Sequence, residues 1–126
     1  MNFERAVKQA LKNPRDAKLR LDRAACKRSL LKFTQMFWPI IEPETSLVMG
    51  RPIEVICDHL QAVAEGKIRR ILINVPPGTM KSTLTSVMLP AWIWGALERP
   101  GERVIGWSYA EQLSIRDNLK CRSIVT

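Results

Sequence analysis

The chain has 126 residues, of which 46% are hydrophobic and 25% charged, and its formal net charge is +8. This length suits one domain or part of one. Residues 1–12 contain no apolar run of the kind found in secretory signals, and the weakly polar stretch 84–97 is interrupted by Pro90 and is shorter than the ~20 residues of a membrane span. We therefore expect a soluble intracellular protein with no membrane segment.

The positive charge is concentrated at the start of the chain. Residues 1–33 hold ten Lys or Arg and three Asp or Glu, which gives +7 of the total +8. A basic arm of this kind is an electrostatic handle for nucleic acid or an acidic protein, although a charge run is also typical of a solvated helix surface. Residues 4–32 contain no aromatic side chain, so we expect any nucleic-acid contact to be with phosphates.

The first half of the chain has the pattern of a helical region. An amphipathic helix is predicted over Phe3–Lys12, and Asn13-Pro14 should end it. A second helix is predicted from Asp16 to about Phe37, closed by Trp38-Pro39. An irregular segment, 40–52, then leads to a helix over about 53–65 that stops at Gly66.

From residue 70 the pattern changes to strand, loop, helix, strand, helix. The apolar run Ile71–Val75 suits a strand covered on both faces. A helix follows from Lys81 to about Gly95, where Pro90 should kink or end it near Leu89. A second strand is predicted over 103–108 and a last helix over 110–124. We therefore expect an α/β fold, a parallel sheet with flanking helices as in P-loop NTPases, over 39–126 after a basic helical region over 1–38.

The loop between the first strand and its helix carries the candidate site. Its sequence, Pro-Pro-Gly-Thr-Met-Lys-Ser over 76–82, departs from the G-x-x-x-x-G-K-[ST] motif, because Val75 and Met80 replace the two glycines. Gly78 can take positive φ, and since the prolines donate no N–H, a phosphate cradle has to come from the amides of residues 78–83. Met80 is the obstacle, since a side chain there restricts φ and brings Cβ near the phosphate.

Two interpretations of this loop remain open. In the first, Lys81 places its charge on the terminal phosphates of a nucleotide and Ser82 supplies a hydroxyl ligand for Mg²⁺. In the second, Pro-Pro-Gly is an ordinary turn and Lys81 is solvated.

The remaining reactive side chains point to no second site. Cys26, Cys57 and Cys121 lie far apart without metal-ligand spacing, so we expect them to be reduced and partly buried. The single histidine, His59, lies in a predicted helix, where we expect it to be structural. Any metal is therefore expected to arrive with the nucleotide.

Several stretches together suggest a family. They are 28–39, His59-Leu60, 68–82, 90–95 and 107–117, in that order. The set resembles the N-terminal part of a tailed-phage terminase large subunit, the ATP-driven motor that packages viral DNA.

The resemblance implies cofactors, partners and residue roles. ATP and Mg²⁺ would be the cofactors, with Lys81 as the catalytic contact to the β and γ phosphates and Ser82 on Mg²⁺. Gln61 lies in the region that would contact adenine. The implied partners are double-stranded DNA, the terminase small subunit, the portal protein and further copies in a ring, in the bacterial host cytoplasm. The nucleotide-binding residues implied are Gly78, Thr79, Met80, Lys81, Ser82 and Thr83, the last with a hydroxyl near the α phosphate.

The family also hydrolyses ATP with an acidic strand and a water-activating glutamate, and cuts DNA with a nuclease domain, none of which we find here. We expect the N-terminal portion of such a motor, with little ATPase activity by itself. Two alternatives stay open: another DNA-acting P-loop ATPase, and a non-catalytic basic module that binds DNA or protein through residues 1–33.

Overall fold

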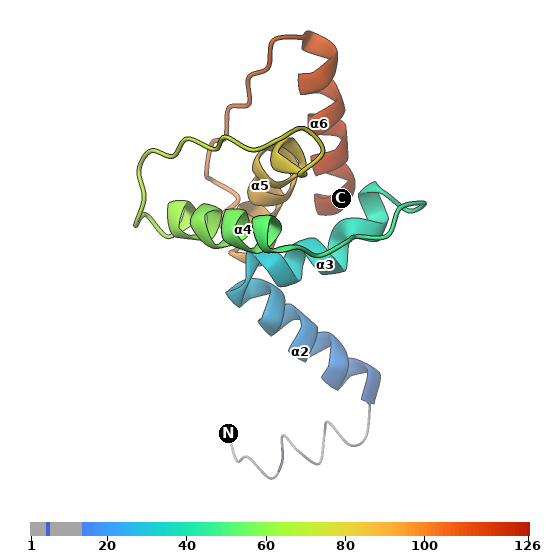
Figure 1. The fold of residues 1–126 in the computed structure, drawn as a ribbon. Helices are drawn as coiled ribbons and strands as arrows, with labels where there is room; N and C mark the ends of the chain where they lie inside the picture. Colours follow the sequence, from blue (N-terminus) through green and yellow to red (C-terminus); the bar gives the residue numbers. More distant parts are fainter. Residues whose placement is uncertain (1–4, 6–13) are drawn as a thin grey trace.

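The computed structural model describes residue 5 and residues 14–126, and its regular elements there are helical (Figure 1). The predicted helix over 3–12 lies outside the described residues, Arg5 excepted. Three of the elements are short segments of one helical run, in which η marks π-helical turns. The elements are α2 (Pro14–Arg28), α3 (Leu30–Ile41), α4 (Arg51–Ala64), η1 (Thr83–Met88), α5 (Leu89–Ala91), η2 (Trp92–Ala96) and α6 (Glu111–Val125).

The predicted α/β fold is wrong: residues 14–126 contain no strand and no sheet. The two segments expected to be strands, 71–75 and 103–108, belong to no regular element, and their backbones form no hydrogen bond with another segment in the described part of the chain. Leu72, expected to be covered, is 85% exposed. The physical reason is that a strand is stabilised by the backbone hydrogen bonds of a neighbour, and the described residues supply no neighbour to either segment.

The long helix predicted over 16–37 is two helices. Ser29 interrupts it with an extended backbone, φ −143° and ψ 117°, and its side chain accepts a hydrogen bond from the Lys32 N–H. This is the N-cap arrangement, which satisfies one of the free amides of a new helix. The second helix, α3, continues past Trp38-Pro39 to Ile41.

Pro90 does not end its helix. Residues 81–96 form one helical run, and wider π-type turns lie on both sides of the proline. The Leu89 N–H donates to the carbonyl of Leu84, five residues back. Such turns occur where the regular bonding of a helix is interrupted, and proline interrupts it by lacking an N–H.

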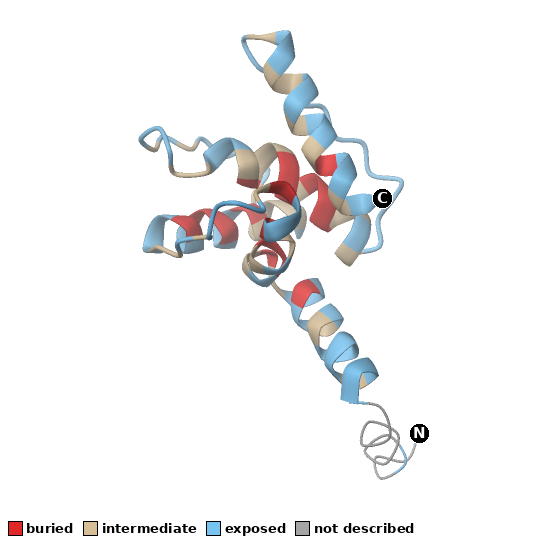
Figure 2. Ribbon diagram, turned by 90° about the vertical axis from the view of Figure 1, so that its right-hand side faces the viewer, coloured by how far each residue is buried: buried red, intermediate tan, exposed pale blue. Residues whose placement is uncertain are grey.

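The core lies where α3, α4, the 81–96 run and α6 meet, as the buried positions in Figure 2 show. Trp92, 1% exposed, is the largest fully buried side chain, and its indole N–H donates to the carbonyl of Cys26 at 2.7 Å. This bond joins the end of α2 to the core. None of the helices that the structure describes is both long and apolar enough to cross a membrane.

Candidate functional site

The loop before Lys81 contains two residues with left-handed backbone. Gly78 has φ 84° and Met80 has φ 61°, both in the left-handed region. Residues with a side chain rarely adopt this conformation, and the usual motif has glycine at position 80. Met80 therefore takes a conformation usual for glycine, although its side chain was expected to disfavour it.

The amides of this loop and of the first helical turn are unused. The first helical bond runs from the Leu84 N–H to the Met80 carbonyl, at 2.9 Å. No acceptor in the described part of the chain binds the N–H groups of residues 78–83. Because Pro76 and Pro77 have no N–H, these six amides are the donors on which the predicted cradle depends.

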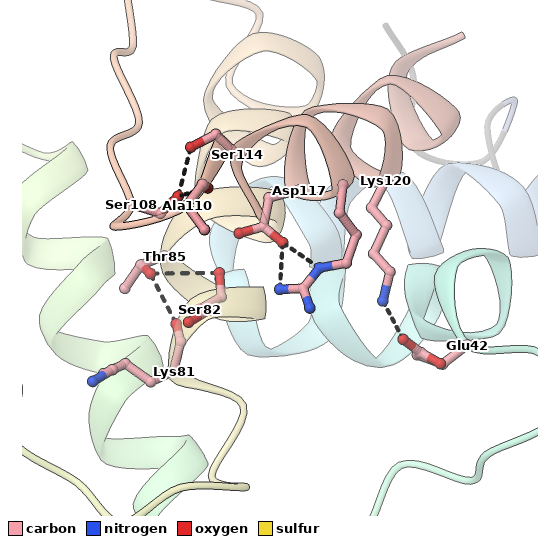
Figure 3. Close-up of polar contacts among 10 residues, drawn as sticks. Glu42, Lys81, Ser82, Thr85, Ser108, Ala110, Ser114, Asp117 and Lys120 are labelled. Carbon is pink, nitrogen blue, oxygen red and sulfur yellow. Dashed lines mark hydrogen bonds and ion pairs between the residues drawn. The ribbon is translucent and has the colours of Figure 1, made fainter. Parts of the chain in front are cut away.

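Two threonine hydroxyls fix the loop and the helix start. Thr79 donates to the carbonyl of Pro76 at 2.7 Å, which closes the turn. Thr85 donates to the carbonyl of Lys81 at 2.8 Å, and Figure 3 shows this bond at the first helical turn. The sequence interpretation missed Thr85; its signal is a threonine four residues after the lysine, the spacing at which a hydroxyl reaches a helix carbonyl.

Lys81 is exposed and pairs with no carboxylate among residues 14–126. In Figure 3 its side chain extends away from Asp117, which is paired with Arg116 at 2.9 Å. The neighbouring Ser82 is also exposed, and its hydroxyl has no partner in the described structure. The Lys81 ammonium and the Ser82 hydroxyl, the two groups expected to contact a nucleotide and its Mg²⁺, therefore have no side-chain partner in the described structure.

A hollow of about 320 Å³ lies at this loop and is lined by residues 75–83. It brings together all the predicted site residues except Gln61. None of the nine lining residues is acidic, and a Cβ placed on Gly78 would meet nothing within 4 Å. An anion fits here, because free amides, a helix start and an ammonium group all favour negative charge. Mg²⁺ fits only together with a nucleotide, since Ser82 and Thr83 offer it no more than hydroxyl oxygens.

Gln61 lies elsewhere and is engaged. Its carbonyl oxygen accepts the Leu30 N–H at 3.2 Å, and its amide nitrogen donates to the Arg28 carbonyl at 2.8 Å and to Glu65 at 3.2 Å. These bonds tie α4 to the break between α2 and α3. The side chain of this predicted adenine contact is thus used in holding three helices together.

The histidine and the cysteines lie outside the candidate loop. The His59 ring donates from Nδ1 to the Val55 carbonyl at 2.7 Å within α4. Cys26, Cys57 and Cys121 are free thiols, and all three are buried, where partial burial was predicted. Burial raises the pKa of Cys57 from 9.0 to about 11, so it is a protonated core thiol at neutral pH.

Comparison with known proteins adds no relative: no protein-family model, no curated protein and no solved structure matches this chain.

Proposed function

We propose that residues 78–83 bind the phosphate tail of ATP, and that the chain forms the phosphate-binding part of a DNA-packaging motor of the terminase large-subunit kind. The observation that carries the proposal is the run of six amides without acceptors in the described structure, set at a helix start beside an unpaired lysine. An ordinary turn has no need for two left-handed residues and a cation facing no carboxylate.

Each group has a role in this proposal. The six amides orient the phosphates, Lys81 neutralises their charge, and the Ser82 hydroxyl would be the protein's contact to Mg²⁺. Mg²⁺ bound with the nucleotide would reduce the negative charge that the loop has to balance. Thr79 and Thr85 keep the loop and the first turn in place, so that the donors are arranged before the ligand arrives.

The same loop lacks a group for hydrolysis. No carboxylate lines the hollow, so none of its residues positions or deprotonates a water. Turnover in phosphoryl transfer depends on that water as well as on phosphate binding. We therefore expect this chain to bind ATP and to hydrolyse it poorly.

Titration calorimetry with ATP and Mg²⁺ tests the site. Lys81→Ala should weaken ATP binding about 10- to 100-fold, because a charged hydrogen bond contributes about 1.5–3 kcal/mol. Lys32→Ala is the matched control, since Lys32 is exposed on α3, forms no ion pair in the described structure and carries the same charge. Equal affinity in the wild type and Lys81→Ala would refute the site.

The stretches that resemble terminases support the choice of a packaging motor over another DNA-acting ATPase. The two differ in their partners: a packaging motor docks on a portal ring. Co-sedimentation of the chain with portal protein separates them, and its absence with ATP binding intact would favour the other ATPase class.

A further inference from the structure

Helix α2 (Pro14–Arg28) extends from the helical body as an arm, which both ribbon views show (Figures 1 and 2). Cys26, near its C-terminal end, is its buried residue. At about 1.5 Å per residue, the 15 residues of the helix span about 22 Å. Its C-terminal part contacts the body: Lys27 pairs with Glu98, and Leu19, Arg23 and Cys26 line a hollow of about 670 Å³ shared with α3, the 81–96 run and α6. The cations nearer its start, 15–20, do not line this hollow and are exposed, so folding alone does not account for them.

The arm is strongly basic. Its acidic residues are Asp16 and Asp22, and Lys27 is paired with Glu98 at 3.2 Å. The other cations are exposed and pair with no carboxylate within residues 14–126. These unpaired cations are Arg15, Lys18, Arg20, Arg23 and Arg28.

Four of these cations form two pairs on different sides of the helix. Arg15 and Lys18 are three residues apart and so are neighbours on the surface, as are Arg20 and Arg23. At about 100° per residue, the mean directions of the two pairs differ by about 140°. Asp22 lies on the side of the first pair and Asp16 on the side of the second, so each side carries two cations and one carboxylate. The arm therefore presents a net positive charge to both sides along one length of helix.

We propose that α2 binds double-stranded DNA by lying along a groove, with one cation pair on the phosphates of each wall. The major groove is about 12 Å wide and admits an α-helix, and a helix placed there has phosphates on both sides. The contacts are to the backbone, so the binding is independent of DNA sequence. This inference goes beyond the loop, because no residue of α2 lines the hollow at 75–83.

Other anionic partners fit the arm less well. A helix that lies on a membrane needs an apolar face, but Leu19 and Leu21 are two residues apart and point to opposite sides. Single-stranded nucleic acid is bound through stacking on aromatic rings, and α2 has none. An acidic protein surface would present charge to one side of the helix, and so would leave one cation pair unused.

The test is fluorescence anisotropy with a labelled duplex of about two helical turns over a range of salt concentrations. In the test variant Arg15, Lys18, Arg20 and Arg23 are all changed to Gln. Removing these four charges should weaken duplex binding about 100-fold or more at about 0.1 M salt, and make the log–log salt slope shallower by about 3.6. A second variant, with Arg15, Arg20 and Arg23 changed to Lys, keeps the charge and should keep the affinity.

The matched control removes the same charge elsewhere, by changing Arg51, Arg69, Arg70 and Arg103 to Gln; all four are exposed and unpaired in the described structure. We expect this control to lose far less affinity. An equal loss in both variants would overturn the proposal, because net charge alone would explain it. A second result would also overturn the proposal: the four-Gln variant of α2 loses binding to phosphatidylserine vesicles or to polyglutamate but keeps its binding to the duplex. Lys81→Ala should leave duplex affinity unchanged, which keeps this test separate from that of the loop.

Discussion

Two side chains occupy backbone conformations that normally belong to glycine. Met80 has φ 61° and Glu98 has φ 55°. The left-handed region costs a residue with a Cβ about 1–2 kcal/mol. At Met80 this cost goes with a loop in which the N–H groups of residues 78–83 have no acceptor in the described structure. The methionine stands where the G-x-x-x-x-G-K-[ST] motif has glycine, yet it adopts a positive φ.

Glu98 allows this cost to be measured away from the candidate site. It directly follows Leu97, at the end of the 81–96 helical run, where glycine is the usual residue. We expect Glu98→Gly to raise the free energy of unfolding by about 1 kcal/mol, because the Cβ clash is removed while the exposed pair with Lys27 contributes little. Urea unfolding measures the change.

Glu98→Ala is the control for that experiment. It removes the same carboxylate and the same ion pair but keeps a Cβ, so it should not stabilise the protein. If the Gly and Ala variants unfold at the same urea concentration, the left-handed conformation at this position carries no cost.

At the scale of elements, the joint between α2, α3 and α4 depends on one amide. Gln61 accepts the Leu30 N–H and donates to the Arg28 carbonyl, so both of its polar atoms are used at the break in the helix. We predict that Gln61→Leu lowers the free energy of unfolding by about 1–3 kcal/mol, since it leaves the Leu30 N–H without an acceptor. Thermal and urea unfolding both report this.

The control for the joint is Gln112→Leu on α6. Gln112 is exposed and its side chain forms no hydrogen bond in the described structure, so its change should stay within about 0.5 kcal/mol. A similar loss in both variants would show that the Gln61 bonds do not hold the joint.

Helices and strands were not equally predictable. The bounds of α4 and α6 were predicted to within two residues, because helical periodicity and caps are local properties of the sequence. The break between α2 and α3 at Ser29 was missed because apolar residues continue at helical spacing on both sides of it. The strands over 71–75 and 103–108 were wrong because a strand depends on a partner segment, and an apolar run cannot show whether one is present.

The local conformation of the candidate loop was predicted more accurately than the fold around it. Its donors, 78–83, and the helix start at Lys81 follow from residue types: prolines without N–H, a glycine with positive φ, and a lysine after a turn. The sequence could not reveal that Met80 would adopt positive φ, nor that Gln61 would bond to the α2–α3 break. Both depend on how distant segments pack.

For the molecule as a whole, the core is held by helices, while the extended segments leave apolar side chains in solvent. Leu72, Ile105 and Trp107 are 85%, 80% and 90% exposed. The core residues join α3, α4, the 81–96 run and α6 into one cluster, to which each of the three cysteines contributes a buried thiol. These thiols give the whole fold a dependence on pH.

Alkaline pH should therefore destabilise the protein in a defined window. Burial raises the pKa of the Cys57 thiol from 9.0 to about 11, and burial raises the pKa of Cys26 and Cys121 as well. Below about pH 9 the thiol is protonated in both the folded and the unfolded chain. Between about pH 9 and about 11 the unfolded chain has lost this proton while the folded chain keeps it, so the free energy of unfolding falls as the pH rises.

Urea unfolding at intervals from about pH 8 to about pH 11, on the wild type and on Cys57→Ala, isolates this effect. The alanine variant is less stable throughout because of the small cavity it leaves, but its decline above about pH 9 should be shallower. The two proteins differ only at residue 57, so the difference in slope reports on Cys57. Parallel declines would mean that this thiol ionises in the folded core as readily as in the unfolded chain.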